Sequence, residues 1–430
     1  MTQSCTDDAS TMNDANGAMQ WLTPEELVNV QVMRERLSCA LPSMLATDFH
    51  LVRWYRAYEG DVDTAVTQLQ RYLRSRRAMH LDRADLIETV MLHPLSTRYL
   101  PYFSVSCLGA KPLNARDNAI VFFQKTDGVN FNELLKVVKI GDLLRMYFMY
   151  NEYYMQLMLQ LEADTKRPAS CQIVFDLTGL PISEYLNPLG PAHQMGRLLA
   201  HIWQGWYGEQ ISKIIVVNPP RLVSAVWQLA RHLLSRSLQQ RITLVSSVAA
   251  LAELIGQQCV PQAMGGPLTD DTGWAQQPAE CVNVPKPITP DDYYDGEQML
   301  AGLKLTDQFE QLSITRESIK HKSTFTVVRT VETVGKMLYY RFKTNADVEF
   351  SIERSHGDKA NELLFPILLL NTVCLPEEGL VRCTTAGDYA LKFTNVVHYW
   401  LSVKVQYIAV LLDEADIAQS EITRIGVVND

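Results

Sequence analysis

Four short apolar runs, separated by segments of helical character, constrain the fold of this chain more than any other feature. The runs are rich in β-branched and aromatic residues, as strands are, and they lie at residues 118–124, 171–177, 211–217 and 241–247. Between the first two, residues 140–163 carry apolar side chains almost all round a helix, and a second apolar-periodic helix lies near residues 190–205. Strands that alternate with long helices pair in parallel through right-handed crossovers. We therefore predict an α/β domain with a mainly parallel sheet at residues 86–268.

The residues before this domain predict short helices. Thr23 and Pro24, followed by two glutamates, form a helix start, because Thr is a good N-cap and Pro suits the first helical turn. A later helical pattern breaks at Gly60 and resumes after it. We predict a helical N-terminal domain at residues 20–85. Residues 1–19 are polar and lack a period, so we expect a disordered tail there.

The period of the apolar pattern changes to two in the last part of the chain. Residues 338–353 alternate apolar and polar side chains on both sides of a central turn, which predicts a β-hairpin with one buried face. Two further segments alternate in the same way, at residues 388–395 and 401–410. We predict an all-β, jelly-roll-like sandwich at residues 313–413. A Gly- and Pro-rich stretch predicts a surface linker at residues 269–312, and residues 414–430 form a C-terminal tail.

Composition and sequence motifs limit the classes of protein to which this chain can belong. A chain of 430 residues needs more than one domain, and its net charge of −9 argues against a nucleic-acid partner, which selects a basic surface. No secretory signal and no C-x-x-C pair are present. The longest apolar run, residues 363–375, is too short to span a bilayer. We therefore expect a cytoplasmic protein, with peripheral rather than integral membrane association.

The motifs of common enzyme classes are missing from the sequence. It has no G-x-G, no P-loop and no G-x-S-x-G. His193 and His201 lack a third ligand nearby, so ordinary packed histidines account for them better than a metal site. Asp176 ends a predicted strand, where it can serve a functional site or cap the following turn, and we favour the cap. We expect no catalytic residue, no metal and no cofactor.

An unusual surplus of apolar residues follows the third predicted strand. Asn218, Pro219 and Pro220 stop that strand, and a helix-like segment begins at once. We call residues 221–234 the gate segment. Its apolar residues cover most of a helical surface, and they include Leu222, Val223, Val226, Trp227, Leu229, Ala230 and Leu233. Core packing alone explains such a segment poorly in addition to the apolar helix at residues 140–163.

Five segments, taken in order, resemble the CRAL-TRIO (SEC14-like) lipid-binding family. They are LVRWYRAYEGDVDTAVTQL, IVFDLTGL, YGEQISKIIVVNPPRLVSAVWQLARHLL, CVPQAMGGPLTDDTG and LPEEGLVRCTTAGDYALKFTNVVHYWLSVKVQYIAVLL. The second matches the D-x-x-G strand end of the family, the third its Y-P-E and N-[AP]-P motifs, and the last resembles GOLD-domain strands. The chain is thus similar to the animal SEC14-like subfamily with a C-terminal GOLD domain, over roughly residues 45–413.

The resemblance implies one lipid in a gated cavity between the sheet and its helices. We expect the gate segment to close it and the wall to include Met146, Tyr150, Tyr154, Phe175, Leu177, Ile182, Leu198, Trp203 and Val216. Phosphoinositide-binding relatives contact the headgroup at positions that match Glu209 and Arg241. The chain departs from that pattern at Gly208 and Leu238, which puts phosphoinositide binding in doubt.

Two accounts of a basic cluster remain open. The cluster comprises Arg71, Arg74, Arg76 and Arg77. Cations suit a helix C-terminus, and they equally suit a surface that meets acidic lipid headgroups.

Two functions also remain open. The first is binding and transfer of one hydrophobic lipid, such as a phospholipid, tocopherol or squalene, with transient membrane contact. The alternative is a lipid-sensing adaptor that recruits a trafficking protein partner through the GOLD-like domain.

Overall fold

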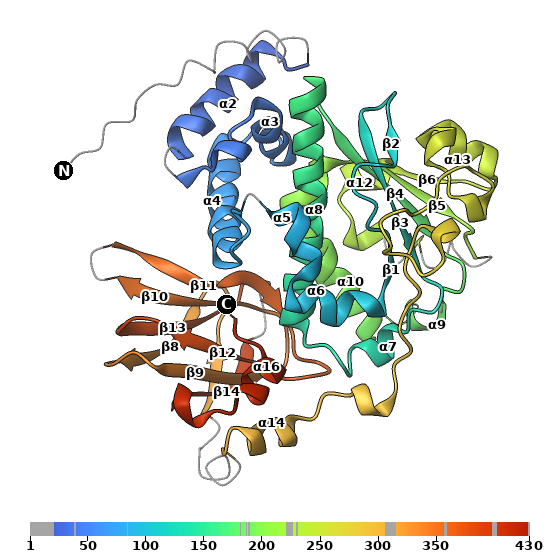
Figure 1. Ribbon diagram of the computed structural model, residues 1–430. Helices are drawn as coiled ribbons and strands as arrows, with labels where there is room; N and C mark the ends of the chain where they lie inside the picture. The colour runs from blue at the N-terminus through green and yellow to red at the C-terminus, as the bar shows by residue number, and fades with distance from the viewer. Residues whose placement is uncertain are drawn as a thin grey trace.

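The computed structural model describes residues 21–37, 40–83, 85–180, 182–185, 187, 190–220, 227–228, 231–305, 315–356, 359–397 and 402–428. Three parts pack together in it: N-terminal helices, an α/β sheet and a β-sandwich (Figure 1). The helix α8 (Ile140–Thr165) runs between the N-terminal helices and the sheet and is buried along most of its length, as its apolar pattern predicted. Among the described residues, no helix combines the length and apolar character that a bilayer-spanning segment needs.

In the described residues of the N-terminal part there are three α-helices of ten or more residues: α2 (Pro24–Leu37), α3 (Asp48–Ala57) and α4 (Val62–Ala78). The predicted start of α2 is confirmed, because the Glu26 amide donates to Thr23 Oγ1 (3.2 Å) and the Thr23 amide donates to Glu26 Oε2 (2.8 Å). Gly60 lies between α3 and α4 with a φ of +84°, which explains the predicted break. Two shorter helices, α5 (Leu86–Thr89) and α6 (Pro94–Tyr99), lead to the sheet.

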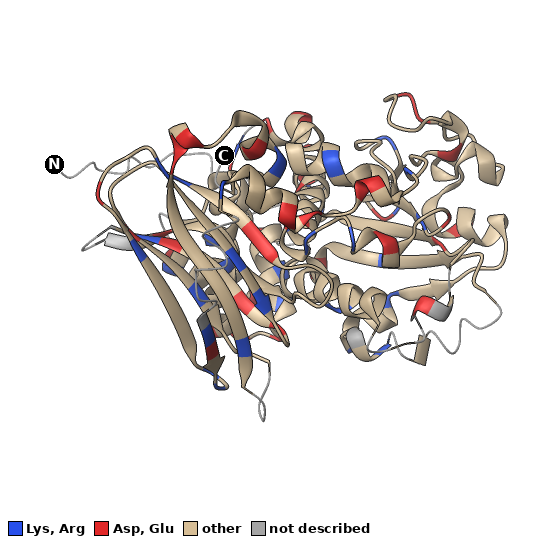
Figure 2. Ribbon diagram, turned by 90° about the horizontal axis from the view of Figure 1, so that it is seen from below, with Lys and Arg blue, Asp and Glu red and all other residues tan. Residues whose placement is uncertain are grey.

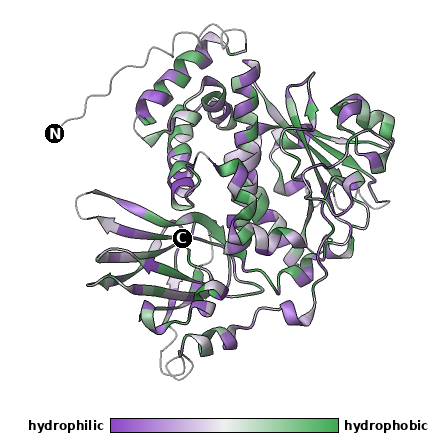
Figure 3. Ribbon diagram, viewed as in Figure 1, coloured by the Kyte–Doolittle hydropathy of each residue, from purple (hydrophilic) through white to green (hydrophobic). Residues whose placement is uncertain are grey.

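The sheet of the α/β part contains the four predicted strands side by side. They are β3 (Ala119–Lys125), β4 (Ser170–Asp176), β5 (Ile211–Val217) and β6 (Ile242–Leu244), and they pair in parallel. Two short strands, β1 (Ser104–Val105) and β2 (Leu113–Asn114), pair antiparallel with β3. Hydrophobic residues predominate along the parallel strands (Figure 3). The described residues of this part also form the helices α7 (Phe131–Leu134), α9 (Ile182–Tyr185), α10 (Pro191–Ile202), α12 (Arg236–Gln240) and α13 (Val248–Ile255).

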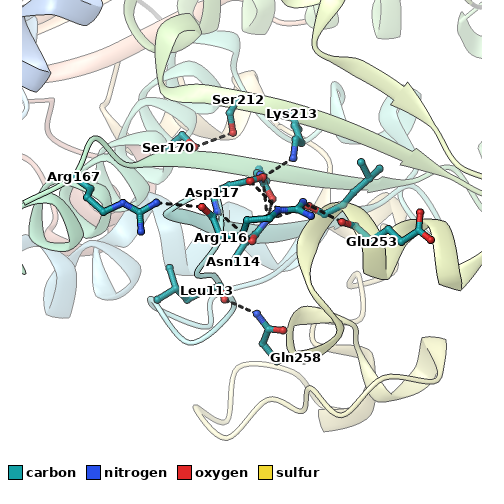
Figure 4. A network of polar contacts seen from close by, with 12 residues as sticks. Leu113, Asn114, Arg116, Asp117, Arg167, Ser170, Ser212, Lys213, Glu253 and Gln258 are labelled. Carbon is teal, nitrogen blue, oxygen red and sulfur yellow. Dashed lines mark hydrogen bonds and ion pairs between the residues drawn. The ribbon is translucent and has the colours of Figure 1, made fainter. Parts of the chain in front are cut away.

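The amino-terminal edge of the sheet is closed by a polar network (Figure 4). Asp117, in the turn before β3, accepts hydrogen bonds from Lys213 Nζ (2.5 Å) and Gln172 Nε2 (2.8 Å). Ser170 and Ser212 share a hydrogen bond of 2.8 Å between β4 and β5. These contacts fix the starts of three strands to one another. A ligand site is therefore expected at the opposite, carboxyl edge, as in other open α/β sheets.

The C-terminal part is a sandwich of two four-stranded antiparallel sheets, which confirms the predicted sandwich architecture. In spatial order, one sheet contains β11 (Lys359–Leu370), β10 (Val348–His356), β13 (Gly387–Thr394) and β8 (Thr324–Val331). The other contains β12 (Glu377–Cys383), β9 (Lys336–Thr344), β14 (Val403–Asp413) and β7 (Thr315–Ile319).

The predicted hairpin at residues 338–353 is wrong. The strand β9 pairs with β12 and β14, whereas β10 pairs with β11 and β13, so the chain changes sheets between them. The rings of Phe342 and Phe350 face each other across the core, with centroids 4.7 Å apart. The alternating pattern correctly reported a buried face on each strand. Strands stacked face to face produce the same pattern as paired strands, so periodicity could not identify the partner.

The segment predicted as a surface linker is partly buried. Cys281 and Val282 pack in a core cluster on one face of the parallel sheet. The Asn283 side chain accepts a hydrogen bond from the Val105 amide (2.9 Å), which ties the segment to β1. The helix α14 (Gly296–Gly302) follows, and α16 (Gln419–Ile425) of the C-terminal region packs against it and against β12.

Candidate functional site

An apolar cavity of about 370 Å³ lies at the carboxyl edge of the parallel sheet. Its floor includes Gln124, at the end of β3, and Phe175 and Leu177, at the end of β4. The two helices α8 and α10 supply most of the remaining wall. The cavity therefore lies where the fold leaves a crevice, on the side away from the polar network of Figure 4.

The sequence periodicity of both helices explains their apolar walls. The residues of α8 that reach the cavity are three or four positions apart, namely Leu143, Met146, Tyr147 and Tyr150. The same spacing holds along α10 and its extension, for Ala192, Met195, Gly196, Leu199, Ala200 and Trp203. Residues at these intervals share one face of a helix. Gly196 leaves space in this wall, because a Cβ added there would meet no atom within 4 Å.

Few polar groups line the cavity, and most already have partners. Tyr150 donates its hydroxyl to the Ser106 carbonyl oxygen (3.0 Å), and its burial raises the pKa well above the usual range. Thr126 donates to the Thr178 carbonyl oxygen (2.9 Å). The Gln124 side chain has no hydrogen-bond partner within the described part of the chain. Gln124 is therefore the polar group most available to a ligand, and no sequence pattern indicated it.

Five of the nine residues predicted to line the cavity do so. They are Met146, Tyr150, Phe175, Leu177 and Trp203. Tyr154 instead stacks on Phe122, with centroids 4.4 Å apart. Leu198 precedes the lining residue Leu199, so its side chain lies on a different face of α10. It is fully buried in the core. Ile182 and Val216 are half-buried and lie outside the cavity lining.

Most of the predicted gate residues fall outside the described part of the chain. These are Leu222, Val223, Val226, Leu229 and Ala230, together with the side chain of Leu233. Trp227 is described and half-buried. Leu234, at the end of the gate segment, lines the cavity. The movement of this segment remains a prediction.

The structure brings the predicted headgroup residues together, but outside the cavity. Arg241 donates to Glu209 Oε1 (2.7 Å) and to the carbonyl oxygens of Gly208 and Ile211 (2.7 Å each). Neither Arg241 nor Glu209 lines the cavity. Their charges are thus compensated by each other, and Leu238 is buried beside them at 2% exposure. The headgroup role of these two residues remains a prediction.

The predicted membrane-facing basic cluster is wrong for Arg76, which is fully buried. Its Nε donates to Glu152 Oε2 (2.8 Å), and the other oxygen of Glu152 accepts from the hydroxyls of Tyr72 (2.5 Å) and Tyr207 (2.6 Å). If one member of such a buried ion pair is removed, the other charge stays buried without compensation, which destabilises the fold.

Two further arginines of the cluster face the sandwich. Arg71 forms an ion pair with Glu349, and Arg74 pairs with Glu353 at 2.9 Å, both on β10. Arg77 is exposed. The end of α4 therefore packs against the β-sandwich. Basic and acidic residues are interspersed across the molecule in Figure 2 rather than collected on one face.

Asp176, which we considered from sequence as a functional candidate, has a structural role. Asp176 Oδ1 accepts from the Thr178 amide (2.9 Å) and from Asn218 Nδ2 (3.0 Å), so it caps the turn after β4 and fixes the end of β5. Over the described ranges, no group of three His, Cys, Asp or Glu side chains is arranged to hold a metal ion.

Comparisons with known proteins find relatives of this chain. A family model described as CRAL/TRIO domain matches residues 118–266, which span the parallel sheet and most of the residues that line the cavity. The CRAL-TRIO domain-containing protein C34C12.6 of Caenorhabditis elegans is 29% identical over 395 residues, which cover 89% of this chain and 94% of that protein. A second such protein of the same organism, F28H7.8, is 21% identical and covers 92% of this chain and 93% of its own length. The crystal structure of Sfh5 aligns with a TM-score of 0.38 at 14% identity, over 68% of this chain and 100% of that chain.

Proposed function

We propose that the chain holds one hydrophobic lipid and transfers or presents it between membranes, because residues 118–266 match a family model described as CRAL/TRIO domain and members of that family bind hydrophobic lipids. The observation that carries the proposal is the apolar cavity at the carboxyl edge of the sheet, between α8 and α10. Phospholipids, tocopherol and squalene all need apolar walls of this kind.

The cavity can supply the necessary binding energy from apolar burial alone. Each methylene group removed from water contributes about 0.8 kcal/mol, so ten of them contribute roughly 8 kcal/mol before the costs of ordering. The cavity offers Gln124 as its available polar partner. A long apolar body with one small polar group fits these walls better than a ligand with several charges.

Exchange of the ligand requires an opening, and we propose that the gate segment provides it at a membrane surface. Leu234 lines the cavity at one end of this segment, so displacement of the segment would uncover the ligand. Opening would then limit the rate of transfer, as lid opening does in many proteins.

The purified full-length chain tests this proposal directly. We expect native mass spectrometry to show one bound lipid, which solvent extraction followed by lipid mass spectrometry would identify. We also expect the protein to move that lipid between donor and acceptor liposomes. A protein that carries no lipid and transfers none would overturn the proposal.

One contact supports the adaptor function as a second candidate. Arg197 lies on α10, whose other face lines the cavity, and it forms an ion pair with Asp347 of the β-sandwich, with a 2.8 Å contact between Nη2 and Oδ1. A ligand in the cavity that displaces α10 would therefore also change the contact between Arg197 and the β-sandwich. If the adaptor function holds, lipid-loaded and lipid-free full-length protein should capture different partners. Identical capture by both forms would count against it. We also propose, from the resemblance, that the sandwich is a GOLD domain.

A further inference from the structure

A second and larger cavity, of about 820 Å³, lies between the three parts of the molecule. We call it the junction cleft. Residues 79–98, the first turns of α8, the strand β12 and residues 419–428 supply its described walls. It shares no lining residue with the apolar cavity, although α8 contributes to both. Its chemistry is also different, because charged side chains line it together with apolar ones.

Basic side chains outnumber acidic ones in the junction cleft. Four Lys and Arg side chains line it, namely Arg83, Arg98, Lys139 and Arg145, together with His80 and His93, against the acids Asp142 and Glu378. Both acids already have partners. Tyr99 donates to Asp142 (3.1 Å), and Tyr339 donates to Glu378 (2.8 Å). Lys139 lies 3.5 Å from Asp142, so the pair adds no net charge. Arg83 is paired with Asp85 (2.7 Å), so the positive excess comes from Arg98 and from Lys139 and Arg145, which share Asp142.

Arg145 is the buried cation with an unused donor. Its side chain is 8% exposed, its Nη2 donates to the Val428 carbonyl oxygen (2.9 Å), and its Nη1 lies 3.6 Å from Asp142 Oδ1. Its Nε has no partner among the described residues. The protein therefore satisfies this guanidinium group only in part, which favours a ligand that brings an acceptor to it.

His93 offers a second donor nearby. Its Nδ1 accepts a hydrogen bond from the Leu95 amide (3.1 Å), so the neutral ring carries its proton on Nε2. Burial and the positive charges of Arg145, Arg83 and His80 lower the pKa of His93 to about 4. The ring is thus held at a positive potential that a bound anion would relieve.

The junction cleft also has apolar lining residues. Leu86 and Val90 come from the helical segment, and Ile422 and Ile425 come from α16. A volume of about 820 Å³ is within the range of pockets that hold small organic ligands. A free inorganic anion would leave this apolar surface uncovered, so the cleft fits a molecule with an acidic end and an apolar body.

We propose that the junction cleft is a second ligand site, which binds a single-chain anionic amphiphile such as a fatty acid. Its acid group lies against the guanidinium group of Arg145 and accepts a hydrogen bond from His93 Nε2, and its apolar body packs between Leu86, Val90 and Ile422. Because all three parts of the molecule contribute walls, a bound acid also holds the β-sandwich against the helical part. This site is separate from the cavity of the proposed function.

The test measures binding of the fluorescent acid 11-(dansylamino)undecanoic acid to the full-length chain. Gly196→Leu serves as the background, because it fills the apolar cavity and leaves the junction cleft unchanged. We expect this background to bind one acid probe, and to bind an uncharged dansyl-alkane of the same length at least tenfold more weakly. Arg145→Met should weaken acid binding at least tenfold. The double variant Arg83→Gln/Arg98→Gln, at more exposed positions, should weaken it severalfold and reduce its dependence on salt.

Arg77→Gln is the matched control, since Arg77 is an exposed arginine outside the cleft, and it should bind the probe as the background does. Equal affinity for the charged and uncharged probes would overturn the proposal. So would unchanged acid binding in both cleft variants. If Arg145→Met does not fold, the double variant decides alone. Displacement of the probe by inorganic phosphate at the probe's own concentration would show that an anion suffices, and would refute the amphiphile. Lipid carriage by the wild-type chain is measured separately, so either proposal can fail without the other.

Discussion

Filling the apolar cavity from Gly196 provides the sharpest test of where the lipid binds. Gly196 lies on the cavity face of α10, and a Cβ added there meets no atom within 4 Å. The substitution Gly196→Leu therefore places four carbon atoms in the cavity without a clash at the backbone. It changes no charge and removes no hydrogen bond.

The expected effects on folding and on binding have opposite signs. Leucine is favoured over glycine inside a helix by about 1 kcal/mol, so the free energy of unfolding should rise. The leucine side chain takes up the space of about four methylene groups of the lipid. The lipid then loses roughly 3 kcal/mol of binding free energy, which corresponds to about a hundredfold increase in Kd. The added side chain occupies a substantial part of a cavity of about 370 Å³.

Urea denaturation gives the stability, and titration with the lipid identified in the purified protein gives the Kd. Gly205→Leu is the matched control, because its added Cβ also meets no atom within 4 Å while the residue lies outside the cavity lining. We expect the control to bind lipid normally. Unchanged lipid affinity in a well-folded Gly196→Leu protein would refute the assignment of this cavity as the lipid site.

Three further predictions concern the contacts that hold the parts together. Arg76→Met leaves a buried carboxylate without its cation, so the free energy of unfolding should fall by about 3–5 kcal/mol in urea denaturation, whereas the exposed Arg77→Met should change little; equal losses would contradict the burial argument. A double-mutant cycle on Arg197 and Asp347 should give a coupling energy of about 1 kcal/mol that falls with added salt, and a coupling of zero would remove this pair from the domain contact. Burial raises the pKa of Glu377 from 4.5 to about 8, so between these pH values the folded protein keeps a proton that the unfolded chain releases. The stability that this proton contributes is complete below pH 4.5 and is lost as the pH rises to 8. Glu377→Gln should flatten that decline in denaturation curves measured between pH 5 and 8, and an unchanged slope would show that Glu377 is not its source.

The strands and the helix near the candidate site could be predicted from local sequence patterns. The strands β3, β4 and β5 and the helix α8 appear within about two residues of their predicted bounds, because β-branched runs and a continuous helical period report burial directly. The turn-capping role of Asp176 followed in the same way from its neighbours in sequence. The strand β6 is shorter than predicted, because Ser247 leaves the strand to cap α13 and accepts from the Ala250 amide (3.2 Å).

The cavity lining was harder to predict, since a helix buried on all sides has no unique inner face. In α8 the side chains of Tyr150 and Tyr154 are both buried, but only Tyr150 lines the cavity. Leu198 and Leu199 differ by one position and therefore by about 100° around α10. Which of two adjacent apolar residues faces the cavity depends on the rotation of the helix against the sheet.

The sequence by itself determined the order of the parts, the parallel sheet and the surplus of apolar helix surface. All three follow from periodicity and composition, which act over short stretches of chain. Only the tertiary structure decided the partners. It separated β9 from β10 into different sheets, paired Arg71 and Arg74 with acids of the sandwich, and buried Arg76 against Glu152. A basic run has the same appearance in sequence whether water, lipid headgroups or carboxylates from a distant strand neutralise it. The difference depends on contacts between residues far apart in the chain.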